Sequence, residues 1–135
     1  MTASAMIRTA VIAALIVGGA TTSIAVAPAF AAATPPGCTQ TWSTPYVSSG
    51  GLIRGSGTGS CQSVGSRTFK LELVHDFSSP WPDVVVVTAA DGGYKIKYST
   101  SYAVCDNGGT TTYYNHAFFS GYAGGVSPRA AFAHC

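Results

Sequence analysis

The chain has 135 residues, only 9% of them charged, and a formal net charge of +2. Its seven Lys and Arg residues form no basic stripe, so the composition excludes a nucleic-acid surface built on phosphate contacts. The length suits one domain with a modest core.

An export signal is predicted over residues 1–31. A single arginine gives the positive charge, an apolar stretch follows, and Ala29 and Ala31 supply small residues where signal peptidase reads the chain. Pro28 and the polar residues before it interrupt the apolar run before it reaches the roughly 20 residues of a membrane span. We therefore expect cleavage after Ala31, with Ala33 as a second site, and a secreted protein that does not span the membrane.

The predicted mature chain begins with an extended arm over residues 32–37, because Pro35 and Pro36 disfavour a helix. A single disulfide-stapled β domain is expected over residues 38–135. Its first strand is predicted at residues 39–42.

A loose hairpin or loop is expected over residues 48–60, which are mostly Ser and Gly. We expect a disulfide at Cys61 to close it.

All four cysteines lie beyond the predicted signal, and an even number in an exported chain indicates two disulfides. Three pairings are possible. We favour Cys38 with Cys61 and Cys105 with Cys135, because sequential pairing closes one loop in each half of the chain. No C-x-x-C motif occurs, and His134 beside Cys135 has no companion at ligand spacing, so we expect neither a metal site nor a cofactor.

Three strand signals follow one another in the middle of the chain. Residues 69–76 alternate in polarity, residues 83–88 form an apolar run, and residues 94–98 alternate again. The Asp-Gly-Gly sequence at 91–93 predicts a turn between the last two. We expect these strands at the centre of a sheet.

Residues 78–83 carry two prolines around Trp81 and predict a stiff turn. We expect Trp81 to cap the core, with a surface-exposed aromatic as the alternative. A second turn is predicted at 106–109, followed by strands at 110–119 and 129–135.

No window of 11 residues in the predicted mature chain has helical periodicity, and turn signals recur at the spacing of short antiparallel strands. The sequence therefore predicts an all-β fold, a small antiparallel sandwich or barrel of about six to eight strands.

Groups for catalysis are scarce. Asp91 and Asp106 belong to predicted turns, while Glu72 and Asp76 lie on one strand face, where a glycosidase-type pair is an alternative to a solvated face. No Gly-x-Ser-x-Gly elbow distinguishes a nucleophilic serine. We interpret the three histidines as structural and do not expect an enzyme.

Aromatic residues are a better indication of function. Alternation along a strand makes neighbours such as Tyr113 and Tyr114 point to opposite faces, so one of each pair is left at the surface. Exposed aromatics on a rigid sheet suit a protein or carbohydrate contact, with cross-strand packing as the alternative. The candidate binding residues are Trp42, Tyr46, Trp81, Tyr113, Tyr114 and Tyr122.

Three segments of the chain form a recognisable layout: Pro36-Gly37-Cys38 with Trp42 soon after, the alternating strand after Cys61, and the ending from Arg129 to Cys135. In these segments the chain resembles the small secreted α-amylase inhibitors of the tendamistat type. The resemblance implies a two-disulfide β-sandwich with sequential pairing. That family presents a Trp-Arg-Tyr triplet, whereas this chain has Trp-Ser-Thr-Pro-Tyr from Trp42, so the resemblance implies the architecture and not amylase inhibition.

The sequence thus predicts a non-enzymatic secreted module that binds another secreted or cell-surface protein, such as an extracellular hydrolase that it inhibits. One alternative is an adaptor subunit of a secreted complex, such as a toxin particle, that uses the arm for strand addition. The other is a small module that binds a polysaccharide.

Overall fold

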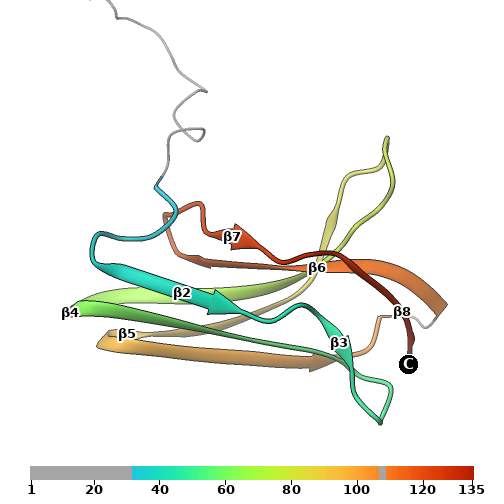
Figure 1. Cartoon of the computed structure of the whole chain (residues 1–135), viewed down its shortest axis with the longest axis horizontal. Coiled ribbons are helices and arrows are strands. Elements are labelled where there is room, and N and C mark those ends of the chain that lie inside the picture. Colours follow the sequence, from blue (N-terminus) through green and yellow to red (C-terminus); the bar gives the residue numbers. More distant parts are fainter. Residues whose placement is uncertain (1–31, 107–108) are drawn as a thin grey trace, which may run out of the picture. The chain divides into compact units, whose positions relative to one another are not determined.

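The computed structural model describes residues 32–106 and 109–135, so the predicted signal peptide lies outside the described residues. In this part of the chain there are seven strands joined in one antiparallel, curled sheet, and no helix is present that could cross a membrane. The prediction of a small all-β fold is confirmed. The strands are β2 (Cys38–Trp42), β3 (Tyr46–Val47), β4 (Ile53–His75), β5 (Val84–Val104), β6 (Gly109–Phe119), β7 (Gly125–Val126) and β8 (Ala130–His134) (Figure 1).

The long strands β4 and β5 both turn a corner. Their register shifts between the pair Ser60 and Lys97 and the pair Gly65 and Lys95, so β4 carries more residues through the corner than β5. Ser99 N–H donates to the Asp91 carboxylate at 2.9 Å, although eight residues of extended strand would separate these groups by about 26 Å. Each long strand therefore folds back and contributes to both layers of the curled sheet.

One layer consists of β2, β3 and the corner-flanking segments 53–60 of β4 and 97–104 of β5. The other consists of residues 65–75 of β4, 84–95 of β5, and the strands β6, β7 and β8. Hydrogen bonds join the layers: Tyr102 Oη donates to Asn115 Oδ1 at 2.5 Å, and Asn115 Nδ2 donates to Ser43 O at 2.7 Å.

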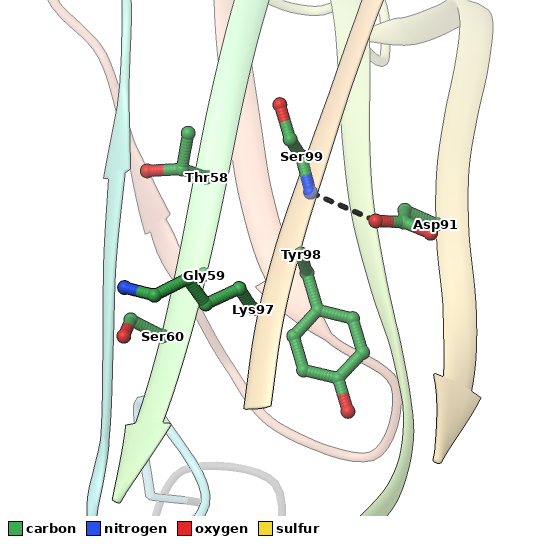
Figure 2. A pocket seen from close by; sticks show the side chains of 7 residues that line it. All are labelled: Thr58, Gly59, Ser60, Asp91, Lys97, Tyr98 and Ser99. Atoms are coloured by element: carbon green, nitrogen blue, oxygen red, sulfur yellow. Dashed lines mark hydrogen bonds between the residues drawn. The ribbon is translucent and has the colours of Figure 1, made fainter. Parts of the chain in front are cut away.

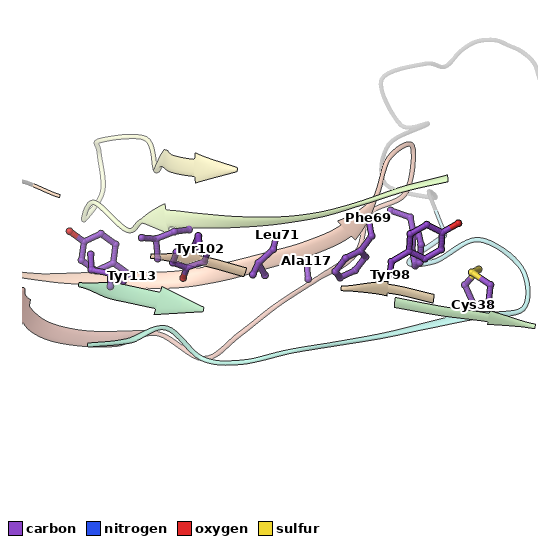
Figure 3. Packing of buried hydrophobic residues seen from close by; sticks show 11 residues of the cluster. Cys38, Phe69, Leu71, Tyr98, Tyr102, Tyr113 and Ala117 are labelled. Carbon is purple, nitrogen blue, oxygen red and sulfur yellow. A yellow bond between two sulfur atoms is a disulfide. The ribbon is translucent and has the colours of Figure 1, made fainter. Parts of the chain in front are cut away.

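The core lies between these layers (Figure 3). Phe69 of β4 meets Phe119 of β6 edge to face with ring centroids 5.2 Å apart, and Tyr98 of β5 meets Phe119 at 5.5 Å. Such aromatic packing stabilises a small domain because each ring buries a large apolar area. The other fully or nearly fully buried apolar side chains include Ile53, Leu71, Leu73, Tyr102, Tyr113 and Ala117.

The expected loop over residues 48–60 is wrong, because β4 begins at Ile53 and runs through the Ser and Gly residues. Gly55, Gly57 and Gly59 occupy alternate positions that face the other layer. A Cβ on Gly55 would lie 2.5 Å from Tyr102 Oη, and one on Gly59 would lie 2.6 Å from Phe119 Cζ. The inward face of this segment is glycine because aromatic rings of other strands fill the space.

The expected turn at residues 91–93 is also wrong, since these residues lie inside β5. They continue the ladder with residues 67–69 of β4 just before the corner, and Gly93 has a φ of +144°, a backbone conformation that favours glycine. Tyr98 Oη fixes this corner by lying within 3.1 Å of the carbonyl oxygens of Gly65, Gly93 and Lys95. The chain changes direction between Lys95 and Lys97 without leaving the strand.

The described residues contain two disulfides, Cys38 with Cys61 and Cys105 with Cys135. This is the sequential pairing that the sequence analysis favoured. The first joins cross-strand partners of β2 and β4. Two disulfides in a small domain are typical of extracellular proteins.

The arm of residues 32–37 is hydrogen-bonded to its own domain. The carbonyl oxygens of Ala32 and Ala33 accept from the N–H groups of Ala123 and Gly124 at 3.0 and 2.9 Å. The arm thus lies along the segment that precedes β7.

Candidate binding surface

The connection between β4 and β5 is held at its base by aromatic stacking. His75 ends β4 and pairs with Val84, the first residue of β5. The Phe77 ring stacks on the His75 ring with centroids 3.9 Å apart. Within the connection, Trp81 N–H donates to Ser78 O at 3.1 Å, which closes a tight turn. We call residues 77–84 the Trp81 turn.

Polar contacts fix both ends of this connection. Tyr114 Oη of β6 donates to the Asp83 carboxylate at 2.9 Å, and Arg129 Nε donates to Asp76. The Arg129 guanidinium also lies 4.4 Å above the Tyr114 ring, a cation–π contact. Partial burial and the acceptor Asp83 raise the pKa of Tyr114, so its hydroxyl keeps the proton that it donates.

The Trp81 turn carries a shallow apolar hollow of about 200 Å³, lined by Phe77, Trp81, Pro82 and Val84. Trp81 is 70% exposed, so the expectation that it caps the core is wrong. Val84 and the next residue, Val85, are each about half exposed. The surface is therefore apolar and open, on a base that stacking and hydrogen bonds hold in place.

A second, larger hollow of about 390 Å³ lies at the corner of β4 and β5 (Figure 2). Lys95 and the N–H of Ser99 hold the pKa of Asp91 below its usual value, so this carboxylate is ionised at neutral pH. Tyr98, the aromatic residue of this hollow, is 2% exposed and offers no ring face for stacking. The residues around it are Thr58, Gly59, Ser60, Asp91, Lys97, Tyr98 and Ser99.

Of the six aromatic residues singled out in the sequence, the structure brings two together, Trp81 and Tyr114, through Asp83. Tyr113 is completely buried and cannot contact a partner, while Tyr114 points outward, as strand alternation predicts. Trp42 and Tyr122 are half-buried against the core. Tyr46 is 52% exposed, but it pairs with Arg54 in the layer that does not carry the Trp81 turn.

The sequence analysis missed Phe77, Val84 and Arg129 as parts of this surface. Phe77 directly follows the alternating strand, and Val84 begins the apolar run, so both read as core residues. Only the two prolines around Trp81 indicated a rigid turn, with an exposed Trp81 as the alternative to a core cap.

The histidines all have polar partners. His75 Nδ1 lies 3.4 Å from Asp106, and His116 Nδ1 lies 3.2 Å from Glu72. His134 Nε2 lies 3.0 Å from Tyr113 Oη, which donates to Asp106 at 2.6 Å. Burial and the neighbouring Asp106 raise the pKa of Tyr113 to about 12, so its hydroxyl remains protonated and its bond to the carboxylate persists.

No family model and no curated protein matches this chain. Among solved structures, the β-glucosidase DesR from Streptomyces venezuelae, in complex with D-glucose, is similar with 13% sequence identity and a TM-score of 0.42. The match covers 73% of this chain but 15% of that chain, so the present chain spans a small part of the enzyme's length. A likeness of this size carries no argument about function.

Proposed function

We propose that this chain is a secreted, non-enzymatic module that binds another protein through the Trp81 turn. The observation that carries the proposal is the 70% exposure of Trp81 beside an apolar hollow. A large aromatic side chain held at the surface leaves apolar area in contact with water. A partner that covers this side chain removes that area from water, which favours binding.

The base of the turn supports this proposal because binding costs less when the binding residues are already ordered. Phe77 stacks on His75, and Asp83 accepts a hydrogen bond from Tyr114. Little backbone freedom therefore remains to be lost when a partner covers Trp81. Rigid tryptophan and tyrosine side chains are enriched among the residues that dominate binding energy.

A sugar ligand fits the same surface less well. Sugar rings stack on aromatic faces but also need hydrogen-bonding groups around them, and the side chains that line the hollow are all apolar. The hollow at the corner has hydroxyl groups, but its aromatic ring is buried. We therefore prefer a protein partner to a polysaccharide.

An adaptor that adds its arm to a neighbour's sheet is also less favoured. Strand addition by residues 32–37 would have to break the hydrogen bonds from Ala123 and Gly124 to the arm. An adaptor that used the Trp81 turn instead would agree with the proposed surface.

Inhibition of an extracellular hydrolase is the more specific form of this proposal. The tendamistat-type inhibitors share the small all-β, two-disulfide layout, but the candidate contact surface here is formed by Trp81 and not by a Trp-Arg-Tyr triplet. We therefore expect a target other than the amylase that those inhibitors bind.

The proposal is tested by immobilising the oxidised, secreted protein and passing native culture medium over it. We expect the wild type to retain a protein that the Trp81→Ala variant does not retain. Tyr46→Ala is the matched control, because Tyr46 is also an exposed aromatic residue but lies on β3.

Retention by Tyr46→Ala together with loss by Trp81→Ala would support the turn as the contact. Equal retention by both variants would refute the proposed surface. Recovery of a hydrolase in inactive form would extend the proposal to inhibition.

A further inference from the structure

Strand β5 forms an outer edge of both layers. Its two halves pair with β4 over residues 84–95 and 97–104, and within residues 32–106 and 109–135 no strand pairs with its other side. The backbone N–H and C=O groups on that side have no strand partner there. Exposed edges of this kind pair readily with another strand.

In the second layer this edge is protected only near its start. Residues 84–90 read Val-Val-Val-Val-Thr-Ala-Ala, without charge or proline. Natural edge strands are commonly protected by lysine, proline or a bulge. Here a one-residue bulge places Val86 outside the regular ladder, since Leu73 pairs with Val87 and Val74 with Val85. The regular edge therefore begins at Val87.

The other half of β5 is better protected. The Asp91 carboxylate accepts the Ser99 N–H at 2.9 Å, so one of the backbone donors of residues 97–104 is already satisfied from within the chain. This difference points to residues 87–91 as the edge that remains open for pairing.

We propose that residues 87–91 of β5 pair antiparallel with the same residues of a second copy of this chain, about a twofold axis at Ala89. A twofold axis makes one surface face itself, so the edge must be complementary to itself. Val87 then lies opposite Asp91 of the second copy and Thr88 lies opposite Ala90, so the centre of the ladder joins small and β-branched side chains and each end pairs a valine with a carboxylate.

Charge disfavours the registers whose axes lie two residues away. An axis at Asp91 would set two Asp91 carboxylates opposite each other, and an axis at Val87 would bring Asp83 close to Asp91 of the second copy; opposed like charges destabilise a strand pair. With the axis at Ala89, Asp83 comes within one position of Lys95 of the second copy. The chosen register therefore brings opposite charges together.

The same register covers exposed apolar residues. Val84 is 49% exposed and Tyr94 is 76% exposed, and these lie on opposite sides of Ala89 along β5. Antiparallel pairing brings Val84 of each copy within one position of Tyr94 of the other. Each Trp81 turn then stands at an end of the shared ladder, so the dimer presents two such turns to partners.

The test is sedimentation velocity of the oxidised, secreted wild-type protein over a dilution series. The test variant combines Thr88→Lys with Ala90→Lys, which places lysines of the two copies in direct cross-strand contact. The control combines Ser101→Lys with Ala103→Lys, which adds the same charge at exposed positions on the other half of β5. All four side chains are exposed, so both variants are expected to fold.

We expect the wild type and the control to form dimers and the test variant to dissociate at least about tenfold more readily. A wild type that stays monomeric at every concentration overturns the proposal. So does a test variant that dimerises as tightly as the control.

Hydrogen exchange of the wild type gives a second measurement that needs no variant. Edge amides within residues 87–91 should exchange more slowly as concentration rises, while those within residues 101–103 should not change. Exchange in residues 87–91 that is independent of concentration would overturn the proposed pairing even if dimers form.

Discussion

Replacing Gly59 with alanine tests the packing of aromatic rings against the glycine face of β4. The new Cβ would lie 2.6 Å from Phe119 Cζ and 3.2 Å from Phe69 Cδ1, both closer than ordinary contact. Phe119 cannot easily move aside because its ring packs edge-on against Phe69 and Tyr98. The substitution therefore forces a shift within the core.

The expected cost follows from two opposing contributions. Inserting a methyl group into a filled core typically costs about 1 to 3 kcal/mol. Replacing glycine also restricts the unfolded chain, which stabilises the native state by about 0.4 to 1 kcal/mol. We expect Gly59→Ala to lower the free energy of unfolding by about 1 to 2 kcal/mol as the net result.

The measurement is urea unfolding at equilibrium with both disulfides intact. Gly50→Ala is the control, because no atom lies within 4 Å of a Cβ at that position. It should leave the free energy of unfolding unchanged or slightly higher. The double variant Gly59→Ala with Phe119→Leu should lose about 1 kcal/mol less free energy of unfolding than the sum of the losses of the two single variants.

Equal stability of Gly59→Ala and Gly50→Ala would refute the reasoning. It would mean that the Phe119 ring does not occupy the space above Gly59. A loss without any coupling to Phe119 would place the cause elsewhere in β4.

Three further predictions concern the core, alkaline pH and the candidate surface. Asn115→Ala should lower the free energy of unfolding by about 2 to 3 kcal/mol in the same urea assay, because it leaves the buried Tyr102 hydroxyl without its acceptor. A loss of free energy smaller than that of a substitution at an exposed site would contradict this. The free energy of unfolding should fall as pH rises from about 10 towards 12, because the unfolded chain releases the Tyr113 proton near pH 10 while the native pKa is about 12. In the Tyr113→Phe variant, the free energy of unfolding should fall less steeply with pH over this range. An equal dependence on pH would exclude this tyrosine as a cause. Trp81→Ala should change the free energy of unfolding by less than about 0.5 kcal/mol, since the side chain is 70% exposed, and a larger loss in the urea assay would show that Trp81 supports the fold.

Local sequence patterns were sufficient to predict several elements. The alternation after Arg67 predicted the part of β4 that ends at His75, and the pattern of residues 110–119 predicted β6, because one buried face imposes a period of two on any strand. The cysteine count predicted two disulfides, and sequential pairing gave their connectivity. The opposite directions of Tyr113 and Tyr114 followed from the same period.

The glycine face of β4 was hidden from sequence analysis. Gly55, Gly57 and Gly59 alternate with polar residues, but glycine carries no apolar side chain, so the pattern indicated a loop. What makes these positions a strand interior is the set of rings that Tyr102, Phe119 and Phe69 supply from elsewhere in the chain. No local window contains both the glycines and these rings.

The corner of β5 and the exposure of Trp81 were also decided by tertiary structure. Asp91 and its two glycines have the composition of a hairpin turn, but Tyr98 and the pairing with β4 hold them inside one strand. Trp81 has the size and apolarity of a core residue, yet its turn extends beyond the end of the layers. Local sequence determined the strands that alternate in polarity and the number of disulfides, whereas packing between distant segments decided which glycine-rich segments are strands, which side chains the core encloses and which are left for a partner.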